Sequence, residues 1–270
     1  MRPFLTIPQG WDCHVHVFDS ACPVRAGHYQ PAHRPIEEIE SVAARSGVGH
    51  LVLVQPSVHG TDNRLLMASL ARNPGRHRAV VVVDSDIALG TLQAMHAAGV
   101  RGVRFNLGSP LGEGPDIERR FDALAPHLRT LGWHLQWFAA PAELPRIAAL
   151  HGGSGIPCVL DHLAGLRADE ACHARSQLDA LAAIADGGGW LKLSGWYRLG
   201  STAPHHDLIA LTRRLADRFG SNLVWGSDWP HTAFAPAAMP PYASTWQPVV
   251  LALGEARATI LRQTLPAIYR

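Results

Sequence analysis

The sequence predicts an α/β protein in which one (β/α)8 barrel, a TIM barrel, spans residues 1–270 as a single domain. Short apolar segments alternate about eight times with amphipathic helical segments. The apolar segments are largely continuous, which is typical of parallel strands covered by helices. Glycine ends several helical segments just before the next strand. An open doubly wound sheet is the structural alternative, but no GxGxxG motif follows the first strand.

The elements follow in regular order along the chain. We expect strands at Trp11–Phe18, His50–Gln55, Ala79–Asp84, Gly102–Asn106, His134–Phe138, Pro157–His162, Trp190–Ser194 and Leu223–Ser227. We expect helices at Pro35–Arg45, Asp62–Arg72, Leu89–Ala98, Asp116–Leu131, Ala142–Leu150, Arg175–Ala185, Asp207–Phe219 and Gln247–Leu265. Two long loops, Asp19–Arg34 and Trp229–Tyr242, follow the first and last strands, at the end of a barrel where catalytic sites lie.

The composition excludes several classes of protein. Hydrophobic residues make up 47% and charged residues 17%, which fits a large buried core and argues against disorder. A formal net charge of +2 indicates neither a nucleic-acid partner nor a membrane surface. The four cysteines form no CxxC pair, and no signal peptide or long apolar run is present, so we expect a protein of the reducing cytoplasm. Monomer and homo-oligomer both remain open.

The segment Asp12-Cys13-His14-Val15-His16 is the most informative part of the first strand. Side chains alternate along a strand, so His14 and His16 should share one face, with Cys13 and Val15 on the other. Two such imidazoles could bind a metal ion or polarise a carbonyl, although two unrelated core histidines are the alternative.

Polar residues also stand at the ends of later strands. Asp161-His162 ends the sixth strand, and by alternation Asp161 should face the helices in a structural role. In a barrel, the strand-end residues would converge at one opening: His14, His16, Ser57, Arg104, Asn106, His162, Ser194, Arg198 and Asp228. Three imidazoles and one carboxylate could bind Zn²⁺ or could activate water without a metal.

Lys192 is the only lysine, and it should face the barrel interior. A buried lysine needs a carboxylate partner, and Asp12 and Asp84 are the candidates. Schiff-base chemistry at Lys192 is the alternative to an ion pair.

The motifs DCHVHVFD, VLVQPSVHGTDN, GVRFNL, VLDHLAG, WLKLSGWYR and LVWGSDWPHT together resemble the amidohydrolase superfamily. They are most similar to its amidohydrolase-related branch, which includes 2-pyrone-4,6-dicarboxylate lactonase. The resemblance implies that His14, His16 and His162 surround the scissile carbonyl and that Asp228 is the general base. It further implies that the substrate oxygens are held by Ser57, Arg104, Arg198 and Tyr29.

Departures from the superfamily pattern bear on the metal. Arg104 stands where binuclear members have a carboxylated lysine, and strand five begins with His134 but ends without the histidine common in mononuclear members. We therefore expect no required cofactor. A single divalent metal such as zinc, held by His14, His16, His162 and Asp228, is the alternative.

Departures from the dicarboxylate lactonase bear on the substrate. Gly165 and Pro110 replace two arginines of that enzyme, and His231 replaces its asparagine. Because arginine binds carboxylates bidentately, the substrate should carry fewer or differently placed anionic groups.

Three further residues are candidates for the pocket wall: His59, Trp137 and His231. The alternative is a loop or packing role for each, and histidines in the helices, such as His77 and His127, should be structural. The sequence thus predicts a hydrolase that opens a small carboxylate-bearing lactone. A zinc-dependent decarboxylase of the same superfamily is the alternative enzyme, and a non-catalytic small-molecule-binding barrel is the alternative of another class.

Overall fold

The computed structural model describes residues 7–108, 116–169, 173–232 and 234–270, and within them eight parallel strands follow one another in chain order. The strands are β1 (Gly10–Val15), β2 (Val48–Val54), β3 (Arg78–Val81), β4 (Val100–Asn106), β5 (His134–Phe138), β6 (Cys158–Leu160), β7 (Trp190–Leu193) and β8 (Leu223–Trp225). β8 returns to β1: Asp228 N–H donates to His14 O at 2.9 Å, and His16 N–H donates to Trp229 O at 2.9 Å. The predicted (β/α)8 barrel is confirmed.

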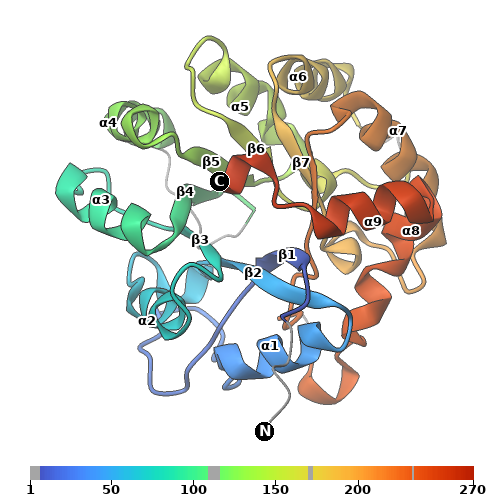
Figure 1. Cartoon of the computed structure of the whole chain (residues 1–270). Coiled ribbons are helices and arrows are strands. Elements are labelled where there is room, and N and C mark those ends of the chain that lie inside the picture. The colour runs from blue at the N-terminus through green and yellow to red at the C-terminus, as the bar shows by residue number, and fades with distance from the viewer. Residues whose placement is uncertain (1–6, 109–115, 170–172, 233) are drawn as a thin grey trace, which may run out of the picture.

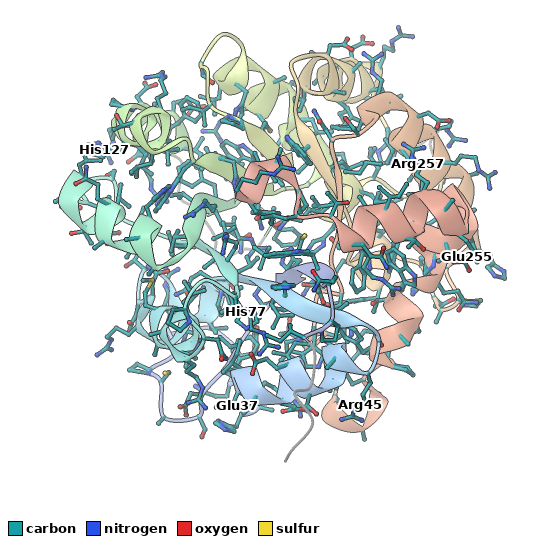
Figure 2. The ribbon with its side chains drawn as sticks, viewed as in Figure 1. Glu37, Arg45, His77, His127, Glu255 and Arg257 are labelled. Atoms are coloured by element: carbon teal, nitrogen blue, oxygen red, sulfur yellow. The ribbon has the colours of Figure 1, made fainter. Side chains whose placement is uncertain are left out.

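The helices form a ring around the strands (Figure 1). They are α1 (Ile36–Ala44), α2 (Arg64–Arg72), α3 (Leu89–Ala98), α4 (Ile117–Leu131), α5 (Leu144–His151), α6 (Arg175–Asp186), α7 (Ile209–Phe219), α8 (Gln247–Leu253) and α9 (Glu255–Gln263). The last predicted helix is two helices, because Gly254 between them has a φ of 77° that a helix cannot contain. Figure 2 shows His127, Glu255 and Arg257 on this outer ring, away from the strands.

Inside the strands lies a second, smaller apolar core, separate from the one between strands and helices. It consists of Trp11, Cys13, Val52, Val54, Val80, Val224 and Tyr269. Tyr269, near the C-terminus, covers the amino ends of the strands, where Arg78 Nε donates to its carbonyl oxygen at 3.1 Å. Figure 1 shows the C-terminal end of the chain over the strands on this side.

Cys13 corrects the expected alternation along β1. It packs in the inner core, although His14 also points inward, because the pairing of β1 with β2 shifts register between Asp12 and Val15. Asp12 is turned outward instead and accepts hydrogen bonds from Tyr242 Oη at 2.8 Å and Ser227 N–H at 2.9 Å. Burial raises the pKa of Asp12 to about 6 despite these hydrogen bonds. Asp12 thereby ties the loop after β8 to β1.

Within the described part of the chain, helix length and hydropathy nowhere reach what a membrane span requires.

The inner core also predicts an acid-sensitive stability. His134, fully buried at the start of β5, has a pKa lowered to about 3, first by burial and then by Lys192. As the pH falls below 6.5, the unfolded chain therefore binds this proton before the folded chain does, so stability is complete above pH 6.5 and declines toward pH 3. Between pH 6.5 and 4.5, the unaltered chain should therefore lose about 2–3 kcal/mol more unfolding free energy than His134→Leu does. Urea denaturation at the two pH values measures this difference.

Val224→Ala is the matched control, because it loosens the same core without removing a titrating group. Val224→Ala should lower the free energy of unfolding by the same amount at every pH, so the slope of stability against pH should match that of the unaltered chain. An unchanged acid slope in His134→Leu would contradict this account.

Candidate active site

The centre of the site is the carboxylate of Asp228, which is fully buried. Its Oδ1 lies 3.6 Å from His14 Nε2, 3.5 Å from His16 Nε2 and 3.9 Å from His162 Nε2. The structure thus brings together the four residues that the sequence singled out. His14 comes from β1 and His16 from the residue directly after it, His162 from the turn after β6, and Asp228 from the turn after β8.

The turns after β6 and β8 aim these side chains inward. Asp228 has a φ of 60° and His162 a φ of 49°, values in the left-handed region that residues other than glycine rarely adopt. At β6 the strand ends at Leu160, so the alternation that we extended to His162 no longer applies there. Asp161 and His162 both face the site, and the prediction that Asp161 faces the helices is wrong.

The second oxygen of Asp228 is held from the segment after β7. Its Oδ2 accepts hydrogen bonds from Tyr197 Oη at 2.6 Å and from Arg198 Nε at 2.7 Å. Burial alone would raise the pKa of Asp228, but Arg198 and the nearby imidazoles hold it well below its usual value of 3.8. Asp228 is therefore a carboxylate at neutral pH, with Oδ1 free of hydrogen bonds.

Hydrogen bonds on the far side of the ring orient His16 and His162. His16 Nδ1 lies 2.7 Å from Val54 O; because a carbonyl only accepts, Nδ1 carries a proton and Nε2 faces Asp228. His162 Nδ1 pairs with Ser194 Oγ at 2.8 Å. Burial lowers the pKa of His162 to about 4 and that of His14 well below 6.5, so both rings are neutral at pH 7.

Beneath His14 lies a buried group of charges. Asp161 Oδ2 accepts from Arg104 Nε at 3.2 Å and from Gln136 Nε2 at 3.0 Å. Lys192 Nζ lies 3.4 Å from Asp161 Oδ1, so the carboxylate partner of Lys192 is Asp161 and not Asp12 or Asp84. The reason is that β6 ends at Leu160, so Asp161 no longer follows the alternation of the strand and lies inside the barrel.

Two arginines flank Phe138 at the opening. The guanidinium carbons of Arg104 and Arg198 lie 5.3 Å and 5.8 Å from the centre of its ring. Arg198 Nη2 also donates to Thr232 Oγ1 at 3.2 Å. Thr232 in turn hydrogen-bonds to Tyr29, which the sequence predicts to bind the substrate. A cavity of about 290 Å³ adjoins this edge, between the loops that follow β1 and β8.

Three other predicted residues make side-chain contacts outside the group around Asp228 Oδ1. Trp137 is a correction: its indole N–H donates to His151 Nε2 of α5 at 2.7 Å, so its ring lies behind the barrel wall, because strand alternation turns Gln136 inward instead. His59 Nδ1 contacts Pro23 O at 3.1 Å. His231 is fully buried behind Asp228, with its ring 5.7 Å from that of Tyr197.

Ser57 begins a short 3-10 helix, Ser57–His59, after β2, and it is half-buried there. Pro110, which replaces one of the two arginines of the lactonase pattern, lies outside the described residues. Roles for Ser57, His59, Tyr29 and His231 stay predictions.

Sequence reasoning missed Tyr197, Phe138 and the role of Gln136. Tyr197 directly precedes Arg198, and Gln136 is a polar residue within an apolar strand, so both carried a signal. Phe138 carried none, because an aromatic residue at a strand end is common in any barrel.

The donor atoms fit a divalent metal ion in their geometry. His14 Nε2 and Asp228 Oδ1 are buried without hydrogen-bond partners, and the contact of His16 Nδ1 with Val54 O leaves Nε2 facing the site. The ligand atoms of His14, His16 and Asp228 lie within 4.8 Å of one another, as those around a single ion would, and His162 groups instead with His14 and Asp161. The charge of the site opposes tight binding of a divalent cation, because cationic side chains outnumber carboxylates. The cations are Lys192, Arg104 and Arg198, and the carboxylates are Asp161 and Asp228.

Residues 11–249 match the family model described as amidohydrolase, which covers most of the chain. The site is a buried cluster of three histidines and one aspartate, and it lies at the carboxyl ends of the strands of a (β/α)8 barrel. The chain belongs to the amidohydrolase family.

The chain is similar over most of its length to several named proteins. The chain is 30% identical over 244 residues to a 4-sulfomuconolactone hydrolase of Rhizobium radiobacter, covering 87% of this chain and 80% of the relative. It is 27% identical over 246 residues to a 2-pyrone-4,6-dicarboxylate hydrolase of Comamonas testosteroni, with 85% and 80% covered. A solved structure from Pseudomonas putida, assigned as a 2-pyrone-4,6-dicarboxylic acid hydrolase, superposes with a TM-score of 0.84 at 29% identity, covering 96% and 97%.

Proposed function

We propose that this protein is a hydrolase that opens a small lactone bearing a carboxylate. The observation that carries this proposal is the asymmetry of Asp228: Oδ2 is fixed by Tyr197 and Arg198, whereas Oδ1 is free and faces three imidazoles. A carboxylate held in this way can take a proton from water in front of a carbonyl that the imidazoles polarise. The named relatives hydrolyse lactones, which supports the same reaction class.

In this mechanism, water beside Asp228 Oδ1 loses a proton to the carboxylate and attacks the lactone carbonyl carbon. Hydrogen-bond donors among the imidazoles stabilise the oxyanion, and the ring opens when Asp228 returns the proton to the leaving oxygen. Arg198 lowers the pKa of Asp228 in the free enzyme. A substrate carboxylate that binds Arg198 would weaken this effect, so Asp228 becomes a stronger base once substrate is bound.

If a divalent ion binds, His14, His16, His162 and Asp228 would hold it, and it would polarise the carbonyl or lower the pKa of water. We propose that the ion is not required, since Arg104 and Arg198 already supply positive charge to the site.

The site supports a substrate with few anionic groups. Arg104 is engaged by Asp161, which leaves Arg198 as the better placed ligand for a carboxylate at the opening. Gly165, in place of an arginine of the dicarboxylate lactonase pattern, adds no charge. A related structure from Acinetobacter baumannii, 25% identical, holds citric acid, which supports a small organic acid as the substrate class.

The alternatives fit the structure less well. A zinc-dependent decarboxylase would use a histidine at the end of β5, but β5 ends at Phe138, and His134 lies at the opposite end beside Tyr269. A non-catalytic binding barrel would not need a carboxylate with a free oxygen buried among imidazoles. Free thiols at Cys13, Cys22 and Cys158 support our placing of the enzyme in the reducing cytoplasm, with a small molecule as its partner.

The first test is to remove the base. Asp228→Asn is nearly isosteric, so the protein should fold while kcat/KM for lactone hydrolysis falls by roughly 10²–10⁴-fold. The substrates to screen are 2-pyrone-4,6-dicarboxylate, a muconolactone and a sugar-acid lactone, with product identification. His162→Asn should keep more activity, because the oxyanion donors are shared. Near-full activity in folded Asp228→Asn would overturn the mechanism.

The second test concerns substrate charge. Arg198→Met should weaken kcat/KM for a carboxylate-bearing lactone by about 2 kcal/mol or more, because a charge-assisted hydrogen bond is lost in a buried site. The loss should be smaller for an uncharged lactone of the same ring size. Arg129→Met is the control, since Arg129 lies on α4 and donates to Ser154 O at 2.7 Å. Equal losses for charged and uncharged lactones would show that Arg198 does not bind the carboxylate.

The third test concerns the metal. Protein purified without added metal should contain well under one equivalent of divalent ion by elemental analysis, and hydrolysis should persist after treatment with a chelator. Stoichiometric zinc, with activity lost on chelation and restored by zinc, would refute metal independence and favour the decarboxylase.

A further inference from the structure

Lys192 contacts four acceptors with three protons. Its Nζ lies 2.8 Å from Gln136 Oε1, 3.1 Å from Cys13 O, 3.3 Å from His14 Nδ1 and 3.4 Å from Asp161 Oδ1. The amide nitrogen of Gln136 donates to Asp161 Oδ2, so its oxygen must face Lys192 and accept the first proton. Cys13 O accepts the second. The third proton can go to His14 Nδ1 or to Asp161 Oδ1.

The choice decides the tautomer of His14. The ring is fully buried, and an ammonium can only donate, so a hydrogen bond from Lys192 requires a lone pair on Nδ1. If Lys192 donates to Nδ1, the proton of His14 must sit on Nε2, the atom that faces the site. If His14 Nδ1–H donates to Asp161 instead, Nε2 presents a lone pair.

Two observations favour the first arrangement. The contact from Lys192 Nζ to His14 Nδ1 has hydrogen-bond geometry, whereas Asp161 Oδ1 has no hydrogen-bond partner. In addition, each ring nitrogen faces a carboxylate, Nδ1 at 3.4 Å from Asp161 Oδ1 and Nε2 at 3.6 Å from Asp228 Oδ1, but only Nδ1 faces an ammonium, which attracts a lone pair and repels a proton.

We propose that Lys192 is a positioning residue that holds His14 as the Nε2–H tautomer, so that His14 is a hydrogen-bond donor to the reacting oxygen. His16 has the opposite polarity, because its Nδ1–H donates to Val54 O. The two imidazoles of the HxH motif thereby have different tasks: His14 accepts at Nδ1 and donates from Nε2 to the carbonyl oxygen, whereas the Nδ1–H of His16 fixes its ring to β2. This division of roles rests on the proposed lactone hydrolysis, whereas the tautomer itself does not.

The tautomer can be measured directly by NMR of protein labelled with ¹⁵N-histidine, in the presence of a chelator. The His14 signals are assigned by their loss in His14→Gln. In the unaltered chain, Nδ1 should show the shift of an unprotonated ring nitrogen and Nε2 that of a protonated one. Lys192→Met removes the donor at similar length and should reverse the two assignments.

Two variants separate donor loss from disturbed packing. Val224 pairs with Lys192 across β7 and β8, so Val224→Ala loosens the same layer and should leave the tautomer unchanged. Lys192→Met/Asp161→Asn removes both charges of the buried pair, and it should also give the reversed tautomer if the single variant does not fold. A proton on Nδ1 in the unaltered chain, or on Nε2 in a folded Lys192 variant, would overturn the proposal.

Kinetics provide a second, separate readout. Losing one preorganised donor should lower kcat of Lys192→Met by about 10²-fold with little change in KM. A loss confined to KM would overturn the positioning role. Absence of hydrolysis of any lactone by the unaltered chain would refute the proposed function and leave the tautomer result standing.

Discussion

The hydrogen bonds that close the barrel between β1 and β8 also build the site. Asp228 N–H donates to His14 O, and His16 N–H donates to Trp229 O, so the two histidines and the carboxylate are held by one pair of main-chain contacts. Gly226 allows this approach, because a Cβ at that position would lie 2.4 Å from His14 Cβ. A substitution that broke these two main-chain hydrogen bonds would therefore disturb both the closure of the sheet and the positions of the reacting groups.

Charge is the second constraint on the site. Removing Asp161 and Asp228 from water is unfavourable unless cations compensate for it, and Lys192, Arg104 and Arg198 provide them. The two carboxylates are partnered differently. Each carboxylate has one oxygen without a hydrogen bond, but the two oxygens face different groups. Asp161 Oδ1 lies 3.4 Å from the Lys192 ammonium, whereas Asp228 Oδ1 faces the three imidazoles. The reactive carboxylate is thus the one whose free oxygen faces the imidazoles.

The sequence contained enough to predict the barrel and the four central residues, because apolar periodicity and strand-end polar residues are local signals. It did not predict positions that depend on irregular backbone. Asp161 and Cys13 were assigned to the wrong face, since alternation fails where β6 ends early and where the register of β1 shifts. Trp137 was assigned to the pocket although the register of β5 turns it toward α5. Contacts between distant segments, such as that of Tyr197 with Asp228, have no signature in a single sequence.

The central claim is that the lactone carbonyl is placed between Asp228 Oδ1 and the imidazoles. A crystal structure of the inactive Asp228→Asn variant with an unhydrolysed carboxylate-bearing lactone tests it most directly. We expect the carbonyl oxygen within hydrogen-bond distance of His14 Nε2 and the carboxylate against Arg198. A lactone bound with its carbonyl turned away from the three imidazoles, or with its carboxylate held elsewhere, would contradict the account.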